Sequence, residues 1–139
     1  MGCQFREIKY EKVRQLGIKD KSLIFAPNSS YYTLADENTI KSIIAVKTAK
    51  NSVKLQANYT FPEYRNQGLF TLLLRCVMDL YKDMNIYADC LHKSVGIYIK
   101  QGFEMYKIQE YKSFTIYKVR LLRDGGVCKE NKQSKNGKT

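Results

Sequence analysis

The chain has 139 residues, of which 44% are apolar and 27% are charged, the composition of an ordinary soluble globular protein. This length allows one domain with a real core and is too short for two. The formal net charge of +11 favours polyanionic partners, such as nucleic acid, a ribosome or a phosphorylated cofactor, although charge also serves solubility alone. No apolar stretch approaches the roughly 18 residues that a membrane span needs, so we expect no membrane association.

The cysteines do not predict a metal site. They are scattered at positions 3, 76, 90 and 128, and the chain has a single histidine. Cys76 and Cys90 fall inside apolar segments and are expected to be buried. The start, MGCQFR, reaches charged residues before any apolar run, which argues against a signal peptide, and Arg6 departs from the myristoylation pattern. We therefore expect reduced thiols and a cytoplasmic location.

Four strands and one short helix are predicted in the first half of the chain. A short strand over 5–8 precedes a helix over 10–17 that ends at a glycine. Two strands, over 29–37 and 39–50, flank a tight turn. The segment 52–61 alternates apolar and polar side chains, which is the period of a half-buried strand.

A long amphipathic helix is predicted over 68–84, because apolar residues recur there at spacings of four and three. Its stripe consists of Leu69, Leu73, Val77, Leu80 and Met84, widened by Leu72 and Cys76.

The remaining elements are a strand over 85–90, a helix over 94–101 that Gly102 closes, and a hairpin of strands over 103–111 and 113–122. The strand, helix and strand between residues 52 and 90 imply a parallel, right-handed crossover within a mostly antiparallel sheet. The predicted fold class is therefore α+β.

The last segment, 123–139, contains five basic residues, two acidic residues and almost no apolar ones. Such a segment cannot bury enough apolar surface to offset the entropy of ordering. The sequence therefore predicts a folded domain over 1–122 and a basic, disordered tail over 123–139.

The stretch PEYRNQGLF, residues 62–70, joins a predicted strand to the predicted long helix. A helix N-terminus exposes about four unpaired N–H groups and about half a positive charge, and a phosphate satisfies both. Gly68 lets the backbone approach an anion closely, and Arg65 offers a fork of donors. Residues 65–70 are thus interpreted as a pyrophosphate cradle, the alternative being a plain turn in which Gly68 serves geometry only.

Two motifs in this sequence resemble those of the GNAT family of acyl-CoA N-acyltransferases. The family pattern Q/R-x-x-G-x-G/A, often preceded by P-E-Y, stands here as PEYRNQGLF, with Phe70 in place of the last small residue. A second family signature, L/F-Y-x-K-x-G-F, stands as IYIKQGF over 97–103. Both motifs occur in the family's order, and the resemblance covers roughly residues 29–122.

The resemblance implies a GNAT-like fold: a mixed, mostly antiparallel sheet with a central pair of parallel strands that splay apart, flanked by helices. It also implies acetyl-CoA as cosubstrate and a primary amine that attacks the thioester directly in a ternary complex. A backbone N–H near Tyr59 or Thr60 would bind the thioester carbonyl. The pyrophosphate would lie on Arg65, Asn66, Gln67, Gly68, Leu69 and Phe70.

Tyr98 matches the family tyrosine that protonates the leaving thiolate, and the alternative is that it is a core aromatic residue. The general base stays open among His92, Asp89, Glu37 and a water chain. Family members usually have an asparagine at the position of Leu91, so this sequence departs from the family pattern there.

The leading hypothesis is an acetyl-CoA-dependent N-acetyltransferase that acts on a primary amine, as a monomer or a homodimer. One alternative is a non-enzymatic module that binds nucleic acid or a ribosome on the same scaffold, which the charge and the many tyrosines favour. Another is an acyl-CoA sensor without turnover. Fold alone does not separate these hypotheses, and the sequence does not identify the amine.

Overall fold

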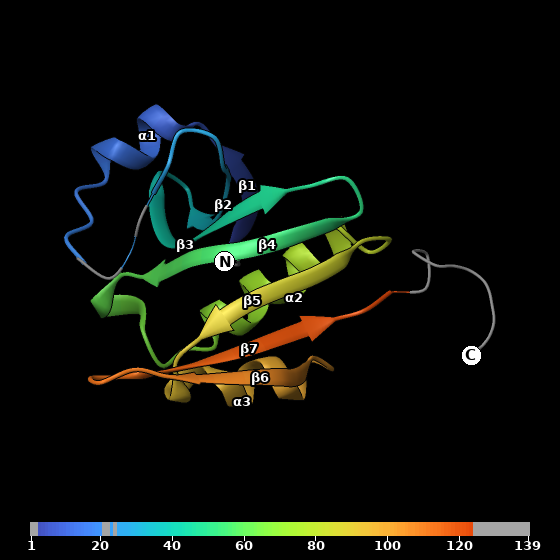
Figure 1. The fold of residues 1–139 in the computed structure, drawn as a ribbon. Coiled ribbons are helices and arrows are strands. Elements are labelled where there is room, and N and C mark those ends of the chain that lie inside the picture. The colour runs from blue at the N-terminus through green and yellow to red at the C-terminus, as the bar shows by residue number, and fades with distance from the viewer. Residues whose placement is uncertain (1–2, 21–22, 24, 124–139) are drawn as a thin grey trace. The chain divides into compact units, whose positions relative to one another are not determined.

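The computed structural model describes residues 3–20, 23 and 25–123 (Figure 1). Its seven strands form one sheet in the order β1-β2-β3-β4-β5-β7-β6. The chain divides into two compact units. The first unit consists of segments 1–48 and 55–79, and the second of segments 49–54 and 80–139. Strand β4 (Ser52–Thr60) contributes residues to both.

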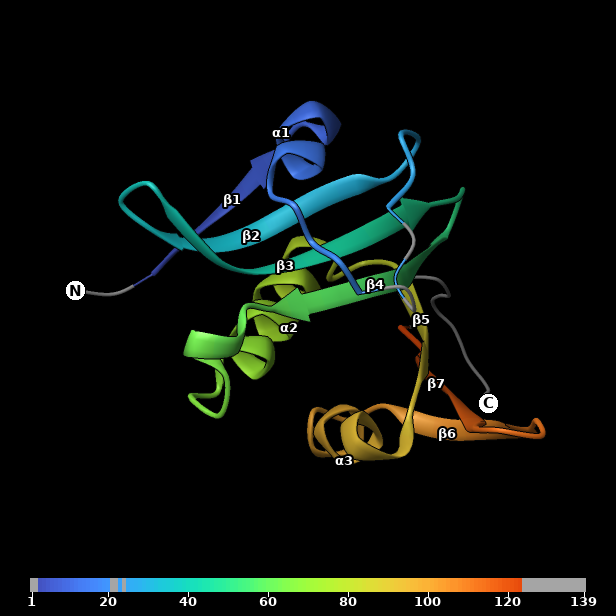
Figure 2. The ribbon, with the colours of Figure 1, turned by 90° about the vertical axis from the view of Figure 1, so that its left-hand side faces the viewer.

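The first unit begins with β1 (Gln4–Ile8) and α1 (Tyr10–Gln15), followed by β2 (Ser30–Asp36) and β3 (Thr39–Thr48). After β4 come the short 3-10 helix η1 (Pro62–Tyr64) and α2 (Leu69–Leu80). Strand β2 pairs antiparallel with both β1 and β3. Figure 2 shows β1, β2 and β3 side by side, with α1 next to β1 and β2.

Helix α1 has only six residues, too few to be stable without tertiary packing. Its buried residue, Val13, packs into an apolar cluster with strand residues from β2, β3 and β4. The buried strand residues of this cluster are Tyr31, Ile43, Ala45 and Ala57. The helix is therefore held against the sheet by the buried Val13, with Tyr10 and Leu16, both partly buried, packed against the same cluster.

The second unit contains β5 (Asn85–Cys90), α3 (His92–Lys100), β6 (Glu104–Glu110) and β7 (Thr115–Leu121). Strand β7 lies between β5 and β6 and is antiparallel to both. The pairing of β6 with β7 confirms the predicted hairpin.

The start of β4 runs parallel to β5 within the second unit. The Asn85 N–H donates to the Asn51 carbonyl at 3.2 Å, and the Lys54 ammonium contacts the Asp89 carboxylate at 3.1 Å. Because the contacts advance along both strands in the same sense, the strands have the same direction. The predicted parallel connection through α2 is thus confirmed.

The predicted elements occur in the predicted order, but the orientation of α2 differs. The helix ends at Leu80 rather than at residue 84, and its buried residues are Leu73, Leu74 and Val77. Leu72, expected to widen the apolar stripe, is 44% exposed, and Leu80 is exposed too. The segment LFTLLLRCV has apolar residues on both sides of the predicted stripe. Periodicity alone therefore could not determine which of the two sides is buried.

The two cysteines expected to be buried differ in exposure. Cys90 is buried, whereas Cys76 is half-buried. Helix α3 begins at His92, two residues before the predicted start. The predicted tail lies outside the described residues, except for Arg123. No helix among the described residues is long and apolar enough to cross a membrane.

The orientation of α2 predicts unequal effects of truncating two adjacent leucines. Leu73 is fully buried, so Leu73→Ala should lower the free energy of unfolding by about 2–5 kcal/mol through lost burial and a residual cavity. Leu72→Ala, the matched control, should change it by less than about 0.5 kcal/mol because that side chain is exposed. Urea titrations followed by circular dichroism measure both. Equal losses would contradict the observed orientation.

Candidate active site

The segment after β4 turns sharply because of its proline. Phe61 N–H donates to the Lys41 carbonyl at 3.0 Å and so extends the pairing of β4 with β3 by one residue. Pro62 has no N–H to continue that pairing, and η1 begins there. Tyr64 N–H and Arg65 N–H then donate to the Phe61 and Pro62 carbonyls. The chain is thereby folded back toward the start of α2.

Two left-handed residues complete the turn. Asn66 has φ +64° and Gly68 has φ +77°. The Gly68 carbonyl accepts the N–H of Leu72 at 3.1 Å, so α2 starts from a residue with no side chain to cap it. A Cβ built at Gly68 would have no neighbour within 4 Å. The backbone here is therefore open to an approaching group.

The first turn of α2 offers free donors. Within the described residues, the N–H groups of Gln67, Gly68 and Leu69 have no protein acceptor. Together with the partial positive charge of the helix N-terminus, such donors suit a phosphate. The side chain of Gln67 donates to the Glu63 carbonyl at 3.4 Å and helps to hold the loop.

Arg65 ties the loop to the strand that precedes it. Its Nε donates to the Thr60 carbonyl at 2.7 Å, and its guanidinium lies 5.3 Å from the centre of the Tyr59 ring. In the described part of the chain, neither terminal nitrogen of this exposed side chain has a partner. Arg65 therefore holds the loop through its Nε, and its two terminal nitrogens remain available to bind a ligand.

Strand β3 adds residues that the sequence analysis missed. The Lys41 ammonium lies 5.0 Å from the centre of the Tyr64 ring and 3.7 Å from the Asp36 carboxylate. Ser42 is fully buried, and its hydroxyl hydrogen-bonds the Thr60 hydroxyl at 2.8 Å. These residues precede the motif by about twenty positions, and only the register of β3 against β4 reveals them. Lys41 places a second cation beside the loop.

The structure brings the predicted cofactor-binding residues together at the junction of β4 and α2, all within the first unit. Asn66, Gln67 and Gly68 are exposed, and Leu69 and Phe70 are half-buried. The set comprises Tyr59, Thr60, Arg65, Asn66, Gln67, Gly68, Leu69 and Phe70.

Tyr98 belongs to the second unit and is buried. Its side chain is 1% exposed, and its ring packs edge-on against Phe103 at 5.1 Å between centres. Burial raises the pKa of the Tyr98 phenol, and the neighbouring Cys90 and Asp89 raise it further. The phenol therefore stays neutral at ordinary pH, a state that fits both a proton donor and a core aromatic residue.

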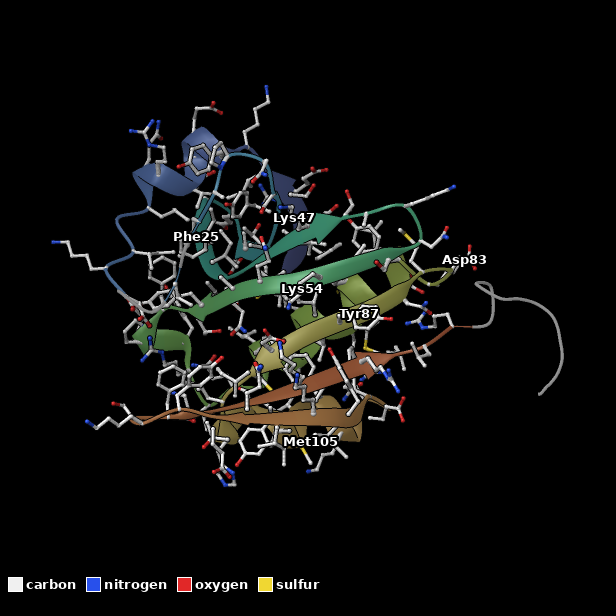
Figure 3. All side chains as sticks on the ribbon, viewed as in Figure 1. Phe25, Lys47, Lys54, Asp83, Tyr87 and Met105 are labelled. Atoms are coloured by element: carbon white, nitrogen blue, oxygen red, sulfur yellow. The ribbon has the colours of Figure 1, made fainter. Side chains whose placement is uncertain are left out.

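The candidate bases lie in different settings. Asp89 accepts from Lys54 at 3.1 Å and from Lys118 at 3.1 and 3.2 Å, so both its oxygens are engaged (Figure 3 labels Lys54 on β4). His92 is the exposed first residue of α3, with its ring 5.9 Å from that of Tyr117. Glu37 lies in the turn between β2 and β3, and its carbonyl accepts from Arg6. The ion pairs of Asp89 disfavour it as a base.

Potential metal ligands do not cluster in the part of the chain that the structure describes. In the described ranges there is no group of three or more His, Cys, Asp or Glu side chains that could hold a metal ion.

No protein-family model and no curated protein matches the sequence, but solved structures do. Arabidopsis thaliana Naa50, in complex with the bisubstrate analogue CoA-Ac-MVNAL, superposes with a TM-score of 0.73 at 16% identity, covering 88% of this chain and 99% of that one. The ribosomal-protein-S18-alanine N-acetyltransferase from Escherichia coli gives 0.72 at 10% identity, covering 86% and 92%.

A third similar structure belongs to a GNAT-family protein. It is an acetyltransferase of the GNAT family from Streptococcus pneumoniae, with a TM-score of 0.67 at 15% identity, covering 86% of this chain and 98% of that one. The chain therefore has the GNAT fold, and the predicted α+β architecture with one parallel strand pair is confirmed.

The burial of Tyr98 predicts a pH dependence of stability. An unfolded phenol has a pKa of roughly 10, and burial raises the folded value above that. The neutral buried phenol therefore contributes its full stability below pH of roughly 10, and this contribution is lost as the pH rises toward the folded value. The melting temperature of Tyr98→Phe should decline less steeply above that pH than the wild-type value.

Melting curves recorded by circular dichroism between neutral and strongly alkaline pH measure this difference. Tyr111→Phe, at an exposed position, is the matched control and should follow the wild-type curve. If Tyr98→Phe also follows the wild-type curve, the phenol is not buried in solution.

Proposed function

We propose that this chain is an acetyl-CoA-dependent N-acetyltransferase that transfers an acetyl group to a primary amine in a ternary complex. The main support is the turn before α2, where a glycine at the helix start leaves the N–H groups of Gln67, Gly68 and Leu69 without protein acceptors. The GNAT fold, shared with N-acetyltransferases that include a structure with a CoA-containing analogue, adds to it. A cytoplasmic location, with reduced thiols, is part of the proposal.

The pyrophosphate of acetyl-CoA would be bound by the turn. The free N–H groups and the helix dipole supply donors and positive potential, and the open space beside Gly68 admits a phosphate oxygen. The two free terminal nitrogens of Arg65 would grip a second oxygen. At the end of β4, an N–H of Tyr59 or Thr60 would bind the thioester carbonyl and the oxyanion that develops there.

In the reaction the ammonium nitrogen loses two protons and the thiolate gains one, so one proton is released to solvent. A base removes the first proton from the ammonium form of the acceptor, and the neutral amine nitrogen forms a bond to the carbonyl carbon. The carbon–sulfur bond then breaks, and the nitrogen loses its second proton. The thiolate then accepts a hydrogen bond or a proton, and Tyr98 is proposed as the donor. Because a thiol pKa of roughly 8.5 lies below that of a phenol, stabilisation of the developing thiolate is the larger part of this role.

The turn predicts that a side chain at Gly68 blocks acetyl-CoA binding. Gly68→Asn keeps a residue that tolerates positive φ but places a side chain in the open space. The dissociation constant for acetyl-CoA should rise at least about tenfold, or about 1.4 kcal/mol, in calorimetric titrations. Gly17→Asn is the matched control, since Gly17 also has positive φ and open surroundings. A folded Gly68→Asn protein with unchanged affinity would remove the main support for the proposal.

Tyr98→Phe tests the proposed proton donor. The substitution keeps the ring and its contact with Phe103 and deletes the hydroxyl, so kcat should fall by roughly 10² or more with little change in KM for acetyl-CoA. Tyr111→Phe, at an exposed position of the same unit, is the control. Wild-type kcat in Tyr98→Phe would leave Tyr98 as a core residue.

Measuring kcat requires an acceptor amine, which a screen of candidate amines must first identify. Peptide amino termini and polyamines are the first amines to test, because acetyltransferases of the same fold act on a ribosomal protein and on spermidine. Acetyl-CoA binding without transfer to any amine would favour the sensor hypothesis over an enzyme.

A further inference from the structure

Strand β6 is the last strand of the sheet in the described part of the chain, so one of its edges has no described partner. Among the described residues it pairs only with β7, and six of its seven residues are exposed. Its large apolar side chains are unusually accessible: Ile108 is 49% exposed, and Tyr111, just beyond the strand, is 51% exposed. Met105 is another exposed member, labelled on β6 in Figure 3. Exposed apolar side chains on an open edge favour pairing with another strand.

A β-bulge protects only the first half of this edge. The register against β7 shifts between Met105 and Lys107, which leaves Tyr106 without a partner position. The Tyr106 ring lies 4.7 Å from the Arg120 guanidinium and packs edge-on against Tyr87. Bulges of this kind disrupt the regular pattern that a further strand would need. After the bulge, residues 107–111 form a regular stretch.

The direction of the backbone groups in this stretch follows from one hydrogen bond. Tyr111 N–H donates to the Phe114 carbonyl across the hairpin at 2.8 Å, so the backbone groups of Tyr111 face β7. These directions alternate along an antiparallel strand. The N–H and C=O groups of Lys107 and Gln109 therefore also face β7, whereas those of Ile108 and Glu110 face outward and are available to a new strand.

We propose that β6 pairs antiparallel with β6 of a second copy of this chain, about a twofold axis at Gln109. Gln109 is the centre of the regular stretch, so this register uses the whole of it. Ile108 then lies opposite Glu110 of the partner subunit, and the outward backbone groups of both form hydrogen bonds. Lys107 lies opposite Tyr111 of the partner subunit, and the two Gln109 side chains meet at the axis.

Charge favours this register over its neighbours. An axis at Lys107 places that ammonium opposite its own copy, and an axis at Glu110 does the same for a carboxylate. Like charges directly opposite each other destabilise a strand pair. An axis at Ile108 brings the bulged Tyr106 into the pairing. The Gln109 register opposes no like charges and pairs an ammonium with an aromatic ring on each side, so the strand is complementary to itself.

The first test is the mass of the protein in solution, measured by sedimentation velocity over a concentration series. The wild-type chain should be a dimer that dissociates on dilution. Gln109→Glu places two carboxylates at the axis and should raise the dissociation constant at least about tenfold. Gln15→Glu makes the same change at an exposed position of α1 and should leave it unchanged. A monomeric wild-type chain, or a dimer indifferent to Gln109→Glu, overturns the proposal.

A disulfide tests the register itself, in a chain whose Cys3, Cys76 and Cys128 are replaced by serine. The two copies of position 109 form a non-hydrogen-bonded pair with Cα atoms about 4.5 Å apart, within reach of a disulfide. Gln109→Cys should therefore crosslink rapidly on mild oxidation. Ile108→Cys should not crosslink. In this register the two copies of position 108 are diagonal neighbours, about 7–8 Å apart, which is too far for a disulfide.

Non-reducing electrophoresis and mass spectrometry of the linked peptide report the crosslink. Crosslinking through Ile108→Cys and not through Gln109→Cys overturns the register. Circular dichroism melting confirms that each variant is folded, so a missing crosslink also counts against the proposal.

Discussion

The left-handed turn between β4 and α2 is the constraint on which the candidate site depends. Pro62 ends the pairing of β4, and the positive φ values of Asn66 and Gly68 bring the chain to the start of a helix. A serine or aspartate cap would be strained at the φ of +77° that Gly68 adopts, whereas glycine adopts it freely. Glycine therefore serves the geometry of the turn and also leaves the N–H groups and the adjacent space open. This combination supports the proposed anion binding.

Strand β4 links the two compact units through the covalent chain. Its first residues belong to the second unit, where the Lys54 ammonium pairs with Asp89. Its later residues belong to the first unit, where Ala57 packs into the cluster beneath α1 and Thr60 hydrogen-bonds Ser42. A substitution along this strand consequently acts on different packing partners depending on whether it precedes or follows residue 55. The turn before α2 is anchored by this later part, through Thr60, and by Lys41 of β3.

The sequence predicted those features that contiguous residues determine. The strands and helices were recoverable from periodicity, and the turn from a short motif. The buried flank of α2 was not, because Leu72 and Leu74 are both apolar and only packing distinguishes them. Lys41 and Ser42 reach the turn through the register of β3 against β4, which no local pattern encodes. The full burial of Tyr98 likewise depends on Phe103 and the strands beneath it.

Burial of Tyr98 has two opposing consequences for acid catalysis. It keeps the phenol neutral, since its pKa is raised, but the same shift makes it a weaker acid toward a thiolate. What burial adds is a fixed hydrogen-bond donor in a low-dielectric setting, where such a bond is stronger than in water. Within the proposed function, stabilisation of developing charge by a hydrogen bond is therefore the larger part of the role of Tyr98, and proton donation the smaller. In the proposed reaction the ammonium proton of the acceptor needs a separate route. Because both oxygens of Asp89 accept from lysines, His92, Glu37 and a water chain are the better candidates.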